Sequence, residues 1–238
     1  METRYMTVTR YPFYDSIIQR GGHTLVAGTN GSGKSVVLNG LIITAMCEGA
    51  QLILLDPKGG VEFNVYRDTL DCIGYGGDLD EFKPALEKAI RIMDDRYRRM
   101  SAAHIRKSNE QPVYVIIDEY ADMMSERKKE LQPLLLKLAR KGRAANVRLV
   151  LATQSPYRSI ITGDIRGNMV NFVALRVTAK TYSRLILEDV GAETLNVGEA
   201  LVKLNGEFEA HRECVPMYSE ENLEQIALWR TPPSKRWK

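Results

Sequence analysis

A glycine-rich segment constrains the fold of this chain more than any other feature of its sequence. A strand-like run that is mostly apolar, His23–Ala27, precedes the segment, and a helix-forming stretch from about Ser35 to Cys47 follows it. Glycines let backbone N–H groups curl toward phosphate oxygens, so a strand, such a turn and a helix in this order predict a phosphate-binding loop. The loop consists of Gly28, Thr29, Asn30, Gly31, Ser32, Gly33, Lys34 and Ser35.

The last two residues of the loop carry specific chemistry. Lys34 supplies a point charge to the β- and γ-phosphates, and the hydroxyl of Ser35 is a ligand for Mg²⁺. The N-terminus of the following helix adds a partial positive charge at the same place. We therefore expect the loop to bind a nucleoside triphosphate together with Mg²⁺.

Two acidic residues complete the predicted site. The apolar run Val113–Ile117 reads as a buried strand, and Asp118 and Glu119 follow it directly. In an open α/β sheet the carboxyl end of such a strand faces the ligand crevice. We expect Asp118 to hold Mg²⁺, partly through water, and Glu119 to activate the attacking water as general base. This arrangement predicts hydrolysis of the nucleotide.

Polar residues also end two further predicted strands. Gln154 follows Val147–Ala152, and its amide is expected to contact the γ-phosphate or the attacking water and so to sense the nucleotide state. Asp56 and Lys58 follow Gln51–Leu55. Either they border the site or they only shape a turn, and the sequence favours neither alternative.

The order of these elements predicts the fold class. Strand-like runs alternate with helical patterns, which indicates an α/β fold with a mostly parallel central sheet flanked by helices. Asn205-Gly206 between two strand-like runs predicts a C-terminal β-hairpin. We expect residues 21–215 to form one domain, residues 1–20 an N-terminal extension and residues 216–238 a C-terminal tail, disordered from Thr231 onward.

Composition excludes several other classes of protein. The 238 residues are 44% hydrophobic and 26% charged, without a run of about 18 apolar residues or a secretory leader, so we expect no membrane span of the chain's own. Three scattered cysteines suit a reducing cytosol. The net charge of +3 is small, but Arg91–Lys107 and Lys137–Arg148 are locally basic, which is typical of solvated helix faces or of a nucleic-acid surface.

Several segments together resemble the motor domain of the FtsK/SpoIIIE/HerA group of P-loop ATPases. The resemblance covers about residues 20–205, and the D-P-K, D-E-x-A-D and L-x-L-A-T-Q-x-P motifs in this order make it specific. The matching segments are His23–Ser35, Leu54–Phe63, Arg96–Met100, Val115–Met124, Lys137–Pro156, Ile160–Asn171, Thr181–Leu187 and Gly191–Glu193.

This resemblance implies a RecA-like fold, ATP as the nucleotide and a ring, usually a hexamer, that translocates double-stranded DNA. In such rings a neighbouring subunit supplies an arginine to the γ-phosphate. The best match for that residue is Arg143, with Arg140, Arg148, Arg166 and Arg184 as rivals. The loop after Gln154 carries Arg158, which we expect to contact DNA phosphates without reading bases.

Full-length translocases of this family also carry an N-terminal membrane region, a further α-rich domain and a C-terminal winged helix. Their absence from these 238 residues favours a compact cytoplasmic motor of a plasmid, conjugative element or virus. Such a motor would act in DNA transfer or packaging with a relaxase, capsid or membrane-channel partner. Two alternatives remain open: an ATPase of the type VII secretion kind that moves proteins, and a low-turnover adaptor that recruits a relaxase.

Overall fold

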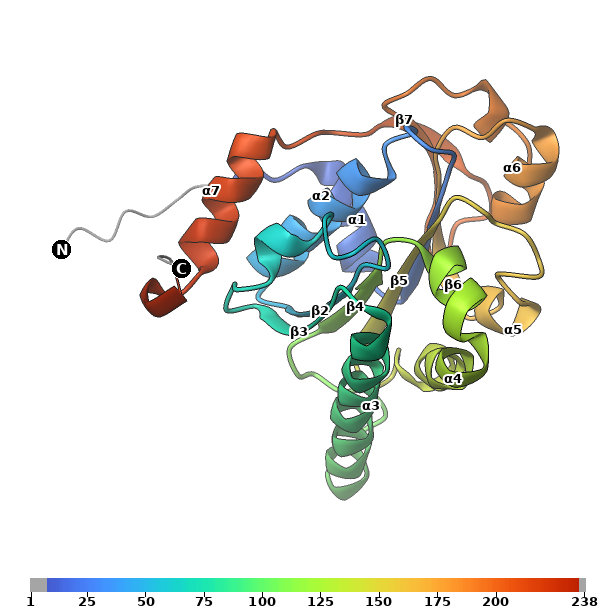
Figure 1. The fold of residues 1–238 in the computed structure, drawn as a ribbon. Coiled ribbons are helices and arrows are strands. Elements are labelled where there is room, and N and C mark those ends of the chain that lie inside the picture. The colour runs from blue at the N-terminus through green and yellow to red at the C-terminus, as the bar shows by residue number, and fades with distance from the viewer. Residues whose placement is uncertain (1–7, 236–238) are drawn as a thin grey trace.

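The computed structural model describes residues 8–235, which fold around a central sheet (Figure 1). Within this range the strands follow the order β3-β2-β4-β5-β1-β6-β7-β8; β1 to β6 are parallel, and β7 and β8 are antiparallel to their neighbours. The predicted fold class, with its C-terminal hairpin, is confirmed. The strands are β1 His23–Ala27, β2 Gln51–Leu55, β3 Cys72–Gly76, β4 Val113–Ile117, β5 Val147–Thr153, β6 Met169–Ala174, β7 Glu199–Lys203 and β8 His211–Cys214.

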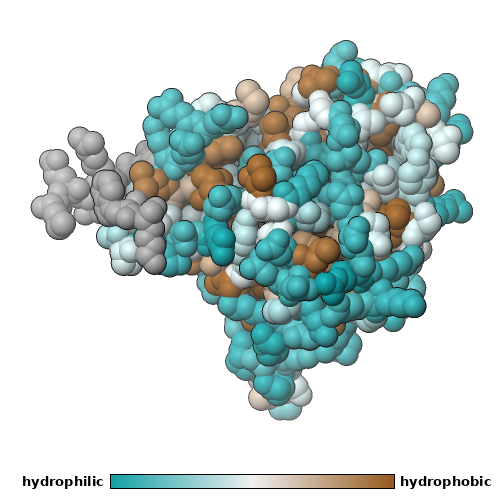
Figure 2. All heavy atoms as spheres, in the orientation of Figure 1, coloured by the Kyte–Doolittle hydropathy of each residue, from teal (hydrophilic) through white to brown (hydrophobic). Residues whose placement is uncertain are grey.

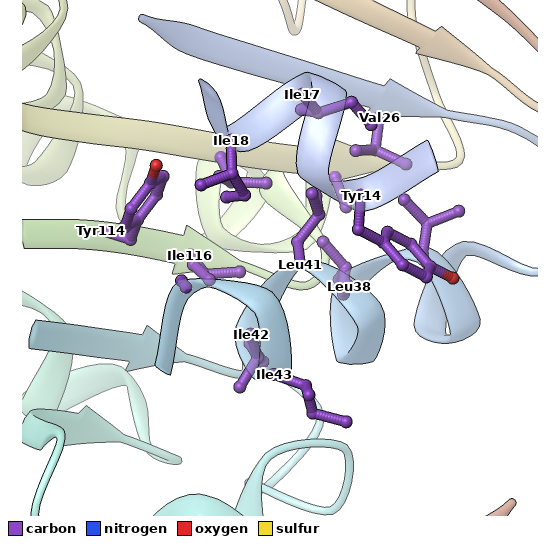
Figure 3. Close-up of a cluster of buried hydrophobic side chains, with 14 of the residues drawn as sticks. Tyr14, Ile17, Ile18, Val26, Leu38, Leu41, Ile42, Ile43, Tyr114 and Ile116 are labelled. Atoms are coloured by element: carbon purple, nitrogen blue, oxygen red, sulfur yellow. The ribbon is translucent and has the colours of Figure 1, made fainter. Parts of the chain in front are cut away.

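Helices cover both faces of the sheet because side chains of a buried strand alternate between the two faces. Tyr114 and Ile116 of β4 pack with α1 and α2 on one face of the sheet (Figure 3). Helix α7 contributes to the same cluster, whereas Val115 packs with α3, α4 and α5 on the other face. Helix α6 packs against the ends of β1 and β6. The helices are α1 Pro12–Arg20, α2 Lys34–Cys47, α3 Leu79–Ala102, α4 Tyr120–Lys141, α5 Gly163–Arg166, α6 Lys180–Leu187 and α7 Glu220–Arg230.

The basic stretch Arg91–Lys107 is only partly a solvated helix face. Figure 2 shows a mostly hydrophilic surface over the projecting end of α3. Arg96, however, is buried, and its guanidinium donates hydrogen bonds to the backbone carbonyls of Gln111, Ala145 and Asn146. These carbonyls lie just before β4 and β5, so Arg96 fixes the amino ends of the two central strands.

Four of the helices and strands were not predicted from the sequence: α1, β3, α5 and α7. Helix α1 lies within the expected N-terminal extension and buries Tyr14 and Ile17, while α7 lies within the expected tail and buries Ile226. The expected disorder from Thr231 onward is wrong for the described part of the tail, since Thr231 is buried and Pro233–Lys235 form a 3-10 turn. Residues 236–238 lie outside the described residues, and the proposed domain boundaries stay a prediction.

The C-terminal hairpin is shorter than its sequence pattern predicts. The pattern places the second strand at Glu207, but β8 begins only at His211. The carboxylate of Glu207 instead accepts a hydrogen bond from the backbone N–H of Leu204, and Asn205 N–H donates to Asn171 in β6. These bonds close a loop at the tip in place of further strand pairing.

None of the helices between residues 8 and 235 combines the length and apolar character that crossing a bilayer requires.

The contact between α1 and α2 gives a stability prediction. A methyl group added at Gly40 would lie 2.0 Å from Cζ of Tyr14, a fully buried residue whose hydroxyl is bonded to the carbonyls of Val36 and Pro216. We expect Gly40→Ala to destabilise the protein, because overpacking costs about 1–3 kcal/mol and alanine regains only about 1 kcal/mol of helix propensity. Urea unfolding measures the effect. Gly163→Ala is the control, since its methyl meets no atom within 4 Å, and equal stability of the two variants would contradict this packing.

Candidate functional site

The predicted phosphate-binding loop connects the carboxyl end of β1 to the N-terminus of α2. Gly33 has a φ of 102°, a backbone conformation that glycine adopts without strain. Helix α2 begins at Lys34 without a side-chain cap and without an acidic residue in its first turn. The first N–H groups of the helix therefore point out of its end without a side-chain partner, which is the arrangement that binds an anion.

The Lys34 side chain folds back against the phosphate-binding loop. The side chain is 7% exposed, and its Nζ donates to the carbonyl oxygens of Gly28 at 3.0 Å and Thr29 at 3.2 Å. Burial lowers the pKa of the Lys34 ammonium, and the negative charge of Glu119 opposes that shift. The ammonium thus lies in the concave side of the loop, where it can exchange carbonyl oxygens for phosphate oxygens.

Asp118 lies directly after β4 and is 1% exposed. Its Oδ2 accepts a hydrogen bond of 2.7 Å from Nζ of Lys58, whereas its Oδ1 is buried and has no hydrogen-bond partner among residues 8–235. Burial raises the pKa of the Asp118 carboxyl, and the Lys58 ammonium acts in the opposite direction. A buried carboxylate oxygen without a partner is a fitting ligand position for a hydrated Mg²⁺ ion.

Glu119 turns away from Asp118 toward the end of β5. Its Oε1 accepts a hydrogen bond of 2.8 Å from the Thr153 hydroxyl, and the backbone N–H of Gln154 lies 3.0 Å from both carboxylate oxygens. Burial raises the pKa of the Glu119 carboxyl, while these hydrogen bonds and the charge of Lys34 oppose the rise. A carboxylate with a raised pKa beside a phosphate loop is suited to accept a proton from water.

Gln154 lies where the sequence predicts, but it contacts the site through its backbone. The backbone N–H, rather than the side-chain amide, bonds to Glu119. Its neighbour Thr153 was missed by the sequence analysis and holds two parts of the site together. The Thr153 hydroxyl binds Glu119, and its carbonyl accepts a bond of 3.3 Å from the N–H of Gly28. A threonine ahead of a strand-end glutamine is a weak signal, because strands are rich in threonine.

The two residues after β2 have separate roles. The carboxylate of Asp56 is fully buried and accepts hydrogen bonds from the backbone N–H groups of Lys58 and Glu62, so it shapes the turn. The Lys58 side chain crosses from this turn to Asp118 and borders the site. Asp56 thus has the expected role in shaping the turn, and Lys58 has the expected position at the border of the site.

Arg143 lies far from the other predicted site residues within the same chain. It is exposed, follows α4 and precedes β5, so it belongs to the amino edge of the sheet, whereas the phosphate loop belongs to the carboxyl edge. Within one chain, Arg143 and the phosphate loop thus lie at opposite edges of the sheet.

Most of the rival arginines are occupied by contacts of their own. Arg148 donates to Ile18 O and to the Tyr114 hydroxyl at the amino edge of the sheet, whereas Arg184 is exposed on α6. The remaining two form ion pairs: Arg140 with Asp164 and Arg166 with Glu188.

Arg158, the expected DNA contact, is exposed on the loop between β5 and α5. Together with Arg166 and Lys203 it lines a cavity of about 510 Å³ that also contains Glu188. The loop begins at Gln154, so the backbone that bonds to Glu119 continues directly into the segment that carries Arg158.

The contact between Thr153 and Glu119 predicts a pH effect. Thr153→Val keeps the shape of the side chain but removes a hydrogen bond to a buried carboxylate, so the pKa of Glu119 should rise further. A bond of about 1.5–3 kcal/mol corresponds to about one to two pH units. If Glu119 is the general base, the acidic limb of the kcat–pH profile for nucleotide hydrolysis moves to higher pH by that amount. Thr153→Ser keeps the donor and should restore the wild-type profile. A wild-type profile in Thr153→Val would contradict this role.

Comparison with known proteins shows which family the chain resembles. A family model described as the FtsK/SpoIIIE family matches residues 4–111. The chain is similar to the DNA translocase FtsK of Streptococcus agalactiae, with 33% identity over 234 residues that cover 88% of this chain and 29% of the relative. The chain thus spans less than a third of the length of that protein.

Two solved structures share the fold at lower identity. One is described as the pCW3 conjugation coupling protein TcpA, in monomer form with ATPγS; its TM-score is 0.77 at 23% identity, covering 86% of this chain and 64% of that chain. The other is the cytoplasmic domain of the Thermomonospora curvata type VII secretion ATPase EccC, with a TM-score of 0.73 at 21% identity, covering 89% of this chain and 28% of that chain. The resemblance expected from the motifs is confirmed: the chain belongs to the FtsK/SpoIIIE family.

Proposed function

We propose that this chain is the ATP-hydrolysing motor of a double-stranded DNA translocase. The observation that carries the proposal is the convergence of three strand ends. Gly28 of the phosphate loop after β1 and Glu119 after β4 are both hydrogen-bonded to Thr153 at the end of β5, and Asp118 directly precedes Glu119 at the same edge of the sheet. The fold alone would not suffice, because P-loop folds serve many functions.

The residues have distinct tasks in this proposal. Loop N–H groups and the Lys34 ammonium bind the β- and γ-phosphates, and Ser35 and Asp118 would hold Mg²⁺. When bound, Mg²⁺ neutralises charge on the β- and γ-phosphate oxygens. Glu119 orients a water molecule and accepts its proton as the water oxygen attacks the γ-phosphorus and ADP leaves.

The connection between the site and DNA runs through the loop after β5. We propose that Glu119 shifts its bond to Gln154 N–H when it engages water, and that N–H begins the loop that carries Arg158. In this proposal the exposed Arg158 contacts DNA phosphates, which gives binding without sequence preference. In a ring, with six copies as the expected number, Arg143 would reach the triphosphate of the neighbouring copy.

We further propose that the motor acts in the cytoplasm in conjugative transfer or genome packaging, recruited by a relaxase, capsid or membrane-channel partner. The similarity to a conjugation coupling protein supports this setting. The similarity to a type VII secretion ATPase keeps protein transport as the second candidate.

A DNA-stimulated ATPase assay tests the proposal. Duplex DNA should accelerate hydrolysis, and the stimulation should weaken steeply with rising salt, because phosphate contacts release counterions. Glu119→Gln should bind ATP but lose about 100-fold or more of its turnover, and Lys34→Ala should lose ATP binding. A rate of ATP hydrolysis that does not change when DNA is added would contradict a DNA motor and favour protein transport. ATP binding without hydrolysis would favour an adaptor.

Arg143→Ala tests the action of a neighbouring copy. The variant should bind ATP normally but lose about 10³-fold in kcat within the assembled oligomer, which is the lower bound for an arginine supplied in trans. Small amounts of the variant should also slow wild-type rings. Arg91→Ala, at an exposed position of α3, is the control. Normal hydrolysis by Arg143→Ala would assign the role to another arginine.

A further inference from the structure

Lys58 reaches the site from a turn whose base is fixed by hydrogen bonds and whose next two residues are glycines. The base is fixed because the buried carboxylate of Asp56 accepts hydrogen bonds from Lys58 N–H and Glu62 N–H. Beyond Lys58 the turn contains Gly59 and Gly60, with φ angles of 77° and 81°. The Lys58 side chain is 38% exposed, so the ammonium can withdraw into water while the backbone stays in place.

Asp118 needs a cation nearby whenever its buried carboxyl group is ionised. The side chain is 1% exposed and its Oδ1 has no hydrogen-bond partner among residues 8–235. A buried carboxylate without a counter-charge is strongly destabilising. Lys58, whose Nζ lies 2.7 Å from Oδ2, supplies that counter-charge in this structure.

The same carboxylate is the proposed ligand of Mg²⁺, partly through water. A lysine ammonium and a divalent cation on one carboxylate repel each other strongly at a separation of a few ångströms. The other acids whose charge acts on Asp118 or on the Lys58 ammonium are Asp56, Glu62 and Glu119. Asp56 and Glu119 are already bonded to backbone N–H groups, and among residues 8–235 the ammonium has its hydrogen bond with Asp118. Lys58 and the metal therefore compete for Asp118.

We propose that Lys58 is a stand-in cation, which neutralises Asp118 while the phosphate site is empty and leaves it when the metal–nucleotide complex binds. The inference rests on the proposed function, because it requires Asp118 to face the metal. It makes Lys58 a positioning residue that stabilises the empty site and weakens metal binding. A motor that must release its product in every cycle gains from this, because the empty state keeps no uncompensated buried charge.

Mn²⁺ binding in the presence of saturating ADP, followed by electron paramagnetic resonance, tests the proposal without hydrolysis or DNA. Lys58→Met removes the competing charge, so Mn²⁺ affinity should rise about fivefold or more, the lower end of typical coupling between ligands. Lys58→Arg keeps the charge and should stay near wild type. Lys83→Met, which breaks the exposed 3.1 Å pair with Glu130, is the control for loss of a lysine. Unchanged or weaker Mn²⁺ binding by Lys58→Met would overturn the proposal.

Thermal unfolding gives a second readout. Lys58→Met should lower the unfolding midpoint of the empty protein but not that of the Mn²⁺–ADP complex, because only the empty state uses the ion pair. An equal loss in both states would identify a permanent structural pair and also overturn the proposal.

The variant Asp118→Asn distinguishes a failure of the Lys58 inference from a failure of the proposed function. If this variant binds Mn²⁺–ADP as tightly as wild type, the metal role of Asp118 fails, and the proposed function loses its metal site together with the Lys58 inference. If Asp118→Asn weakens binding and Lys58→Met leaves it unchanged, only the Lys58 inference fails.

Discussion

The site depends on the groups that stabilise the negative charges of two adjacent carboxylates. Both carboxylates are buried at the end of a central strand. Asp118 and Glu119 are both 1% exposed, and neither could remain charged there without partners. Because β4 lies between β2 and β5, Asp118 finds Lys58 on one side and Glu119 finds Thr153 on the other. The strand order therefore decides which groups stabilise each acid: a counter-charge for Asp118 and hydrogen-bond donors for Glu119.

The elements that were predicted correctly have a recognisable pattern within their own short stretch of sequence. The bounds of β1, β2 and β4 agree with their apolar runs, and the phosphate loop follows from its own residues. The missed elements lack such patterns. Strand β3 is an edge strand with glycine at two of its five positions. Helix α7 buries Ile226 but leaves Leu228 and Trp229 partly exposed, so its sequence shows no apolar stripe.

The partners of the site residues were less predictable than the residues themselves. The sequence indicated that Asp118, Glu119 and Gln154 follow strands of a mostly parallel sheet, whose carboxyl ends meet at one edge. The bond from Lys58 to Asp118 joins residues 60 positions apart and requires knowledge that β2 adjoins β4. Likewise, the role of Thr153 follows from the pairing of β4 with β5. Roles that need a second copy or DNA, those of Arg143 and Arg158, stay predictions.

The most direct test of the account is a crystal structure with Mg²⁺ and a non-hydrolysable ATP analogue. The account predicts the triphosphate over residues 28–35, the Lys34 ammonium on phosphate oxygens instead of the Gly28 carbonyl, and the metal between Ser35 and Asp118. A nucleotide bound elsewhere, or a bound nucleotide with Lys34 still on Gly28 and no metal near Asp118, would contradict it.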